Sequence, residues 1–299
     1  MGAATGGARE GRNLMRLSRV MHVTSISLAA GVCAWMLLPM LWAATSALKP
    51  LEETYAFPPT FRTQSPQPGN FVEAFRRLPM ARFVLNSTWI AGVSAFGAVL
   101  TSAMAGYALA RFEFRGRRIV GACVLAALLV PSQILIVPRF LQYEWLGWLG
   151  TYKPLIVPAW LGGGAFNVLL FRQFFVATPR EAEDAARLDG AGPWTVFLRV
   201  ALPSVRPAVV TAWFLSFVFH WQEFLDPLLY LTDFKTFPVS LGLRMFQTLA
   251  GTWANLLMAA SLTAMLPLVL LFLMMERDLM RGLGVLASVR RGRETGDPD

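Results

Sequence analysis

The side chains best suited to chemistry lie inside a strongly apolar stretch of the chain, residues 207–230. At about 100° per residue, six polar or ionisable residues there fall within an arc of about 160° on one helix. They are Ser216, His220, Gln222, Glu223, Asp226 and Tyr230. Asn167 adds an amide from an earlier apolar stretch. Hydroxyl, amide and carboxylate groups beside aromatic residues are suited to a sugar, whose rim forms hydrogen bonds and whose faces stack.

Enzymatic chemistry is poorly supported by the same residues. His220 and Glu223 are the one pair that could exchange a proton, and no nucleophile accompanies them. The two cysteines, Cys33 and Cys123, lie in apolar runs, so we expect buried, inert thiols. Their spacing fits neither a disulfide framework nor a metal site. The sequence therefore predicts no catalytic residue, no metal and no cofactor bound by this chain.

A second distinctive feature is the charged stretch TPREAEDAARLDGA, residues 178–191. Thr178 is expected to cap a helix, with Pro179 in the first turn and Glu181 completing a capping box. Alanines favour the helix, and Gly190 is a suitable C-terminal stop. The helix could lie on a membrane surface or dock into a groove of another protein. Its small apolar side chains favour docking.

The composition indicates a membrane protein. Hydrophobic residues make up 55% of the chain, charged residues 15%, and the mean hydropathy is +0.50. These values are too apolar for a soluble domain, and several runs are long enough to cross a bilayer. The net charge of +9 fits an excess of arginine on one side of the membrane better than binding to nucleic acid.

The fold class that we predict is an all-α membrane protein with six transmembrane helices. The predicted spans are 23–47, 84–110, 119–138, 154–176, 207–230 and 253–275. Small residues in the second span should allow close helix packing, and Gly162–Gly164 should give either close packing or a helix break. Pro131 should kink the third span. The predicted divisions are an N-terminal segment at 1–22, the first helix, a core at 80–276 whose charged loop is 177–206, and a tail at 277–299.

The distribution of positive charge predicts the orientation. An even number of spans places both termini and the 177–206 loop on one side. That side carries 18 of the 27 Lys and Arg residues. Because cytoplasmic loops are enriched in these residues, we expect the termini and the charged helix to be cytoplasmic.

The roles of the polar residues within spans stay open at this point. Such residues are costly in lipid and are candidates for a substrate path. His220, Gln222 and Glu223 could line a cavity or pack between helices, and the same holds for Asn167. Asp226 lies about 28 Å along the predicted fifth helix, near the outer surface, where it could be solvated or paired with Arg244.

The charged loop and its surroundings resemble a known family. Residues 179–207 are similar to the EAA loop of binding-protein-dependent ABC importer permeases. The matching positions are Pro179, Glu181, Ala185, Ala186, Asp189, Gly190, Ala191, Leu202, Pro203 and Pro207. Ala182 and Asp184 depart from the family's Leu and Glu. Residues 86–118, 130–140 and 220–243 resemble the carbohydrate branch of that family, of the maltose-transporter type.

The resemblance implies a type I importer fold and a function. The chain would be a permease subunit in a bacterial-type cytoplasmic membrane, working by alternating access with a second homologous permease subunit, as a heterodimer or a homodimer. Its coupling helix would contact a dimer of ATP-binding cassette ATPases through Glu181, Asp184, Ala185, Ala186, Asp189, Gly190 and Ala191. An extracytoplasmic solute-binding protein would deliver the substrate.

The nucleotide chemistry would then belong to a partner. ATP and Mg²⁺ would bind the ATPases, since the phosphate-binding pattern GxxxxGK[ST] is absent here. The substrate would be a sugar, an oligosaccharide or a polyol, with glycerol phosphate as an alternative. An ion-driven secondary carrier is the competing class, although the sequence shows no inverted repeat.

Overall fold

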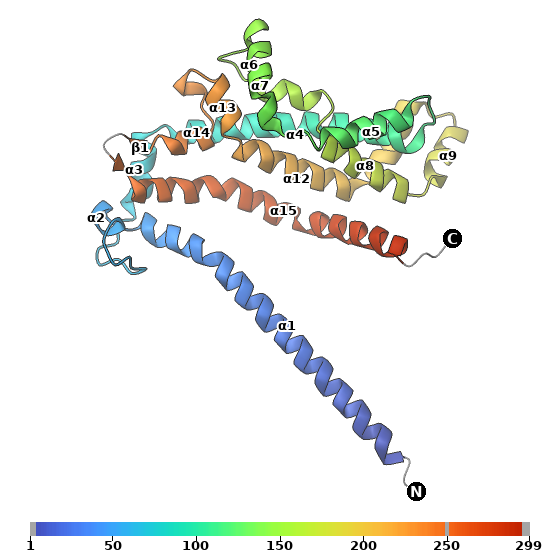
Figure 1. Ribbon diagram of the computed structural model, residues 1–299, viewed down its shortest axis with the longest axis horizontal. Coiled ribbons are helices and arrows are strands. Elements are labelled where there is room, and N and C mark those ends of the chain that lie inside the picture. The colour runs from blue at the N-terminus through green and yellow to red at the C-terminus, as the bar shows by residue number, and fades with distance from the viewer. Residues whose placement is uncertain (1–3, 249–250, 295–299) are drawn as a thin grey trace.

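The computed structural model describes residues 4–248 and 251–294, and side chains from residue 21 to residue 280 except those at 248 and 251. Most of the described chain is helical. The long helices are α1 (Ala4–Ala47), α4 (Met80–Arg111), α8 (Ala165–Ala177), α12 (Arg206–Gln222) and α15 (Ala254–Glu294). In Figure 1, α4, α8, α12 and α15 run side by side along the long axis, while α1 diverges from them. The predicted all-α class is confirmed for the described residues.

Shorter elements connect these helices. On one half of the chain they are α2 (Leu51–Thr54), α3 (Gly69–Arg77), α5 (Arg117–Ala127), η1 (Ser132–Leu135), α6 (Ile136–Trp145), α7 (Lys153–Ile156) and η2 (Val157–Trp160). The other half has α9 (Glu181–Leu188), α10 (Pro193–Val196), the π-helix η3 (Phe197–Ala201), α11 (Leu202–Ser204), α13 (Leu225–Tyr230), η4 (Phe234–Thr236) and α14 (Val239–Arg244). A two-stranded antiparallel ribbon, β1 (Gln247–Thr248) and β2 (Gly251–Thr252), precedes α15.

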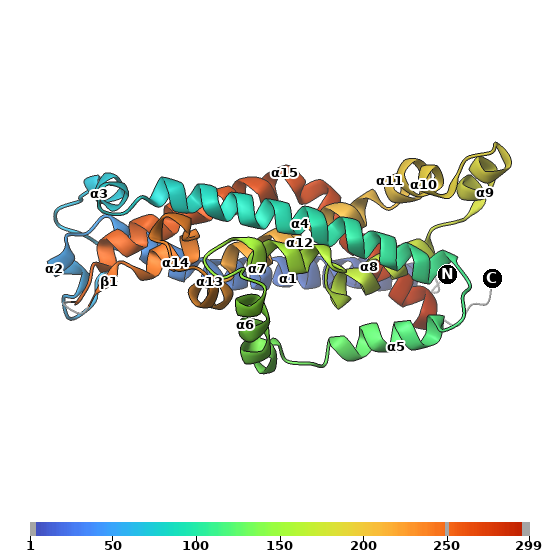
Figure 2. The same ribbon diagram turned by 90° about the horizontal axis from the view of Figure 1, so that it is seen from above.

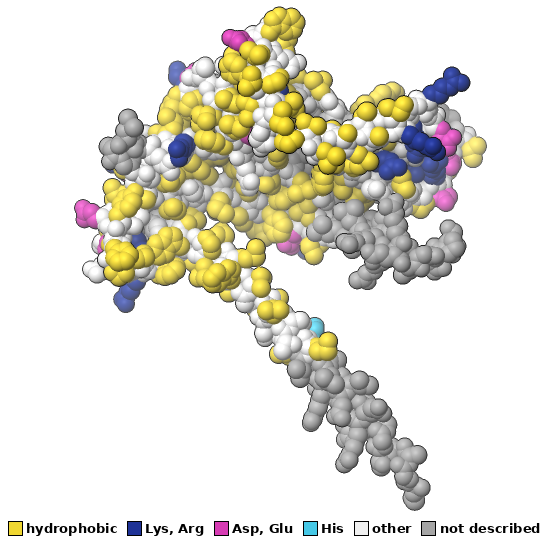
Figure 3. All heavy atoms as spheres, in the orientation of Figure 1, with side chains coloured by type: hydrophobic (Ala, Val, Ile, Leu, Met, Phe, Trp, Pro, Cys, Tyr) yellow, Lys and Arg dark blue, Asp and Glu magenta, His cyan; other side chains and the backbone are white. Residues whose placement is uncertain are grey.

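Four stretches are long and apolar enough to cross a membrane. They are Met21–Ala47, Met80–Arg111, Lys153–Ala177 and Ala254–Met280. Each covers a predicted span with its ends moved by a few residues. Apolar side chains also dominate the visible outer surface of the helical body in Figure 3, whereas charged side chains gather at the end that holds α9. This distribution suits a protein surrounded by lipid.

The predicted third and fifth spans differ from single helices. Arg117–Ala127 and Ser132–Trp145 meet at 93°, so Pro131 marks a sharp bend and not a mild kink. The helix of the predicted fifth span, 207–230, ends at Gln222, and a second bent pair, Pro193–Ser204 and Arg206–Gln222, meets at 82° just before that span. Counting each bent pair as one span gives up to six.

Small residues set how closely α4 approaches its neighbours. A Cβ added to Gly163 would lie 2.0 Å from the Ala98 carbonyl oxygen, and one added to Gly106 would lie 2.6 Å from Cβ of Phe171. Since real Cβ atoms do not approach other heavy atoms so closely, these glycines hold α4 and the α8 segment in direct backbone contact. The prediction of close packing is confirmed for the second span and for Gly163, and the Gly162–Gly164 run also separates η2 from α8.

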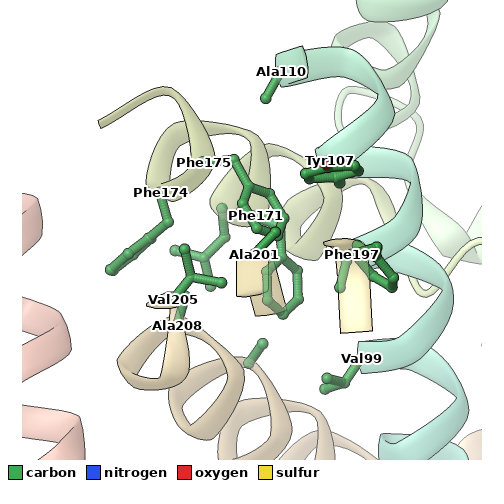
Figure 4. Close-up of a cluster of buried hydrophobic side chains, with 13 residues drawn as sticks. Val99, Tyr107, Ala110, Phe171, Phe174, Phe175, Phe197, Ala201, Val205 and Ala208 are labelled. Atoms are coloured by element: carbon green, nitrogen blue, oxygen red, sulfur yellow. The ribbon is translucent and has the colours of Figure 1, made fainter. Parts of the chain in front are cut away.

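Buried aromatic side chains fill the space between α4, α8, η3 and α12. Phe171 and Phe175 project from α8 towards Tyr107 of α4 and Phe197 of η3, while Phe174 of the same cluster points to the other side (Figure 4). The Tyr107 ring lies edge-on to Phe175 with a centroid separation of 5.1 Å. Burying large aromatic rings gives this junction much of its packing energy. The junction adjoins α9, because the hydroxyl of Tyr107 bonds to Glu183 of that helix.

Two further predictions, on the cysteines and on the C-terminal tail, differ from the structure. The thiols of Cys33 and Cys123 are exposed and free, not buried as predicted. The tail predicted from residue 277 continues α15 as a helix through Glu294. Residues 1–3 and 295–299 of the predicted terminal segments lie outside the described residues.

Candidate functional site

The charged stretch forms a short helix, α9, at one end of the molecule (Figure 2). Its C-terminus is built as the sequence predicts. Gly190 has φ +85°, and the amides of Ala191 and Gly190 donate to the carbonyls of Ala186 and Arg187, both at 3.0 Å. This pair of bonds is a Schellman motif, which needs a left-handed residue at the Gly190 position.

The predicted capping box at the N-terminus of α9 is wrong. The helix begins at Glu181, with Arg180 as its cap residue and no side-chain cap. The Thr178 hydroxyl instead donates to the carbonyl of Phe174 at 2.8 Å, at the end of α8. A threonine can satisfy the preceding helix as readily as the following one, and α8 takes it here.

The outer face of α9 carries most of the predicted partner-contacting residues. Those exposed are Glu181, Asp184, Ala185, Asp189 and Gly190, while Ala186 and Ala191 are half-buried. Asp184 is paired with Arg187 at 2.9 Å within the helix. Leu188, which the sequence reasoning did not select, is 90% exposed at the end of this face.

The inner face of α9 holds a residue that the sequence reasoning missed. The Glu183 side chain is only 3% exposed and forms an ion pair with Arg111 of α4 at 2.8 Å. The hydroxyl of Tyr107 donates to its other carboxylate oxygen, also at 2.8 Å. The available signal was the spacing of Tyr107 and Arg111, four residues apart on one face of a helix end.

Three of the predicted path residues meet at one cavity. A space of about 660 Å³ is lined by Asn167 of α8 and by Ser216 and His220 of α12. The Asn167 side-chain amide donates to the Ser216 hydroxyl and to the Gly163 carbonyl, both at 2.9 Å. The cavity wall thus joins a buried polar network to apolar neighbours such as Phe166 and Phe219.

A second cavity, of about 160 Å³, adjoins the first towards α13 and shares His220 with it. Its charged lining consists of Arg139, Glu223 and Asp226. Arg139 of α6 approaches Asp226 at 3.4 Å, so the partner of Asp226 is Arg139 and not Arg244. Asp226 belongs to α13, beyond the end of the α12 span, and burial raises the pKa of its carboxyl while Arg139 opposes the rise.

The predicted single polar arc is wrong because the helix breaks at Glu223. The ring of Pro227 cannot follow a helical carbonyl at Glu223, four residues earlier. The Glu223 carboxylate accepts hydrogen bonds from the amides of Leu225 and Asp226, which starts α13 in a new direction. Gln222 is consequently exposed and outside both cavity linings.

Tyr230 is also separated from the cavities. It is fully buried and packs edge-on to Tyr143 with a centroid distance of 5.0 Å. Among the side chains that the structure describes, no group of three or more His, Cys, Asp or Glu could hold a metal ion. The arrangement therefore offers hydrogen bonding and charge along two cavities, together with a charged helix at one end.

The chain is similar to known transport proteins in sequence and in fold. Residues 78–279 match the family described as binding-protein-dependent transport system inner membrane component. The chain is 35% identical over 67% of its length to the arabinooligosaccharides transport system permease protein AraQ of Halalkalibacterium halodurans, and covers 71% of that protein. It is 31% identical over 71% of its length to the sn-glycerol-3-phosphate transport system permease protein UgpE of Brucella abortus, covering 75% of it.

A solved structure shares the fold at low sequence identity. It is that of a bacterial ABC transporter involved in the import of the acidic polysaccharide alginate. The TM-score is 0.75 at 17% identity, and the match covers 88% of this chain and 97% of the other. At that identity the likeness concerns the arrangement of helices alone.

Proposed function

Because this chain belongs to the binding-protein-dependent transport system inner membrane components, as a multi-pass permease subunit of an ABC importer in the cytoplasmic membrane, we propose that it imports a neutral carbohydrate and is driven through α9. The observation that supports this most is the outward face of α9. A helix that presents Asp184, Leu188 and Asp189 to solvent, at the end of a lipid-facing body, is suited to dock into another protein.

The partner that we propose for α9 is a dimer of cytoplasmic ATP-binding cassette ATPases. These subunits would bind ATP and Mg²⁺, and their closure would move α9 and open the transmembrane path outward. The contact residues would be Glu181, Asp184, Ala185, Ala186, Asp189, Gly190 and Ala191. Leu188 joins them, because an apolar side chain so exposed at a charged end of the molecule marks an interaction site.

The proposed topology has six spans, with each bent pair counted as one, and both termini in the cytoplasm. The start of α1 and the end of α15 lie at the same end of the molecule as α9 in both ribbon views (Figures 1 and 2). The Arg-rich turn between α4 and α5 lies there too. This arrangement agrees with the enrichment of positive charge on the cytoplasmic side.

The remaining proposed partners follow from the family. A second homologous permease subunit, identical or different, would complete the path. An extracytoplasmic solute-binding protein would deliver the substrate at the end opposite α9. Lipid would cover the apolar outer surface, and no nucleic acid is involved.

The substrate path that we propose uses Asn167, Ser216, His220 and Glu223. These side chains provide amide, hydroxyl, imidazole and carboxylate groups along two adjoining cavities. Gln222 and Tyr230, which the sequence also offered, lie outside both linings and are not included.

The charge of the second cavity favours a neutral substrate over glycerol phosphate. Glu223 and Asp226 contribute two carboxylates and Arg139 one guanidinium, so an anion would meet net negative charge in a confined space. Hydroxyl groups of a sugar would instead find both donors and acceptors. Because one relative is the sn-glycerol-3-phosphate transport system permease protein of Brucella abortus, glycerol phosphate is the competitor to test against a neutral sugar.

The test is reconstitution of the complete transporter in proteoliposomes, with and without the ATPase subunits. We expect uptake of a labelled neutral oligosaccharide to require ATP and to compete with other neutral sugars, but not with glycerol phosphate. Asp184→Lys should abolish uptake and weaken co-purification of the ATPase, whereas Asp184→Glu should be tolerated. Uptake in the absence of any ATPase would refute the proposal in favour of a secondary carrier.

A further inference from the structure

A buried ion pair connects α9 to the transmembrane body at a point separate from its docking face. Glu183 and Arg111 have side chains that are each 3% exposed, and their charged atoms are 2.8 Å apart. Asp184, the next residue on α9, is 58% exposed. Neighbouring carboxylates on one short helix therefore have different surroundings, and only Glu183 is shielded from water.

Both carboxylate oxygens of Glu183 are held by the last turns of α4. One accepts from Nε of Arg111 at 2.8 Å, and the other accepts from the Tyr107 hydroxyl at 2.8 Å. Arg187 of α9 adds a third group, at 3.6 Å from Glu183 and 3.4 Å from the Tyr107 hydroxyl. A buried charge with partners on each oxygen is fixed in direction as well as position.

The segment that joins α8 to α9 is tied to the same helix end. Arg111 donates from its second guanidinium nitrogen to the Thr178 carbonyl at 2.9 Å. Arg180 donates in the opposite sense to the Ala110 carbonyl at 3.3 Å. Because the connection and the helix are both bound to α4, a displacement of α9 must displace the end of α4 or break buried polar contacts.

The helix α4 leads from this point to the proposed substrate path. Gly106 rests against Phe171 of α8, and Ala98 rests against Gly163, whose carbonyl accepts from Asn167. These contacts involve backbone and short side chains, which transmit a shift with little compliance. The Tyr107 ring is itself packed among Phe175 and Phe197. A continuous set of packed groups therefore joins Glu183 to Asn167.

We propose that Tyr107, Glu183 and Arg111 form a coupling latch, which makes α9 and α4 move as one body so that ATPase closure reaches the cavity wall. In this latch Glu183 is a positioning residue and touches neither the ATPase nor the substrate. The inference rests on the proposed function, in which α9 receives the movement of the ATPase. Without the latch, the ATPase still docks on the outer face of α9, but its movement is absorbed at the connection between α9 and the body.

The test measures the number of substrate molecules imported per ATP hydrolysed by the complete transporter in proteoliposomes. Glu183→Gln removes the charge and keeps the size of the side chain. Tyr107→Phe keeps the ring in its aromatic cluster and removes only the hydroxyl. We expect the ATPase to co-purify with both variants and to hydrolyse ATP, while import per ATP falls about tenfold in Glu183→Gln and by less in Tyr107→Phe.

A matched control and a rescue distinguish coupling from folding. Glu113→Gln changes an exposed carboxylate at the same end of α4 and should leave the ratio unchanged. The single variant Glu183→Arg places two cations together, and the double variant Glu183→Arg with Arg111→Glu restores an opposite pair. We expect the double variant to recover import per ATP relative to the single one.

The outcomes separate this inference from the proposed function. If the wild-type complex imports sugar with ATP, but Glu183→Gln and Tyr107→Phe both keep the wild-type ratio, the latch is refuted. The latch is also refuted if Glu183→Gln prevents assembly while Tyr107→Phe keeps the full ratio and the double variant rescues nothing. Failure of the wild-type complex to import with ATP would instead refute the proposed function.

Discussion

Adding one methyl group at Gly163 tests the contact that holds α4 against the α8 segment. In Gly163→Ala the new Cβ would lie 2.0 Å from the carbonyl oxygen of Ala98, 2.8 Å from its carbonyl carbon and 2.9 Å from Cβ of Ser102. Ordinary contact begins at 3.4 Å. Two of these three neighbours are backbone atoms, so no side-chain rotation relieves the overlap, and α4 must move away.

The cost has two parts. Gly163 has φ +65°, where a residue with a Cβ is strained by about 1–2 kcal/mol. The overlap adds the cost of overpacking a tight interface, about 1–3 kcal/mol. The sum is about 2–5 kcal/mol, which corresponds to a fall in melting temperature of about 4–20 °C at about 2–4 °C per kcal/mol.

Gly162→Ala is the matched control. Gly162 also has a positive φ, +119°, but a Cβ there meets nothing within 4 Å. The Gly162→Ala variant is therefore destabilised by backbone strain alone, without steric overlap. Thermal unfolding of the purified chain in detergent, followed by tryptophan fluorescence, should rank wild type above Gly162→Ala and Gly162→Ala above Gly163→Ala. Equal melting temperatures for the two variants would show that the contact between Gly163 and Ala98 is absent, and with it the rigid wall on which the latch depends.

Three further changes probe the site. Asn167→Leu leaves the Ser216 hydroxyl and the Gly163 carbonyl without their donor, which should lower stability by about 1–3 kcal/mol per buried group. The same variant should raise the KM of sugar uptake. An unchanged KM would remove Asn167 from the path. In Gly190→Ala the new Cβ meets no other atom, so the cost is the backbone strain at φ +85° alone, about 1–2 kcal/mol. The variant should capture less ATPase in a pull-down. An unchanged affinity for the ATPase would contradict the Schellman motif. Asp226→Asn should lower stability by less than about 1 kcal/mol, because the ion pair of Asp226 with Arg139 is partly exposed. It should also make glycerol phosphate a better competitor of sugar uptake. If competition by glycerol phosphate does not change, the charge argument is refuted.

Four of the apolar spans and the end of α9 were predicted correctly, because hydropathy and the backbone conformation of glycine act locally. An apolar run of sufficient length must be helical in lipid, whatever its neighbours are, and this identified four of the spans. Gly190 ends α9 as expected, since a left-handed residue after a helix needs no tertiary contact. Asn167, Ser216 and His220 share a cavity because polar groups within spans avoid lipid and so converge on the same interior space.

The two main errors have different causes, one local and one set by a distant segment. Extending one helix from residue 207 to residue 230 ignored Pro227, which breaks the helix at Glu223 with the help of hydrogen bonds from the following amides. The sequence did contain that signal. By contrast, nothing local distinguishes the buried Glu183 from the exposed Asp184. Only the fold brings Arg111, 72 residues away, against one of them and not the other.

The isolated position of α1 has a consequence for how the protein is made. None of the most apolar part of Met21–Ala47 is buried, and α1 is held at its C-terminal end, where the Lys49 carbonyl accepts from Asn70 at 2.9 Å and from Asn255 at 3.3 Å. A helix surrounded by lipid needs no protein neighbour to be stable, so α1 can insert before the later helices have been synthesised. Asn255 belongs to α15, the last of the described helices along the chain. The bond from Asn255 therefore forms only after α15 has been synthesised, although α1 precedes every other described helix along the chain.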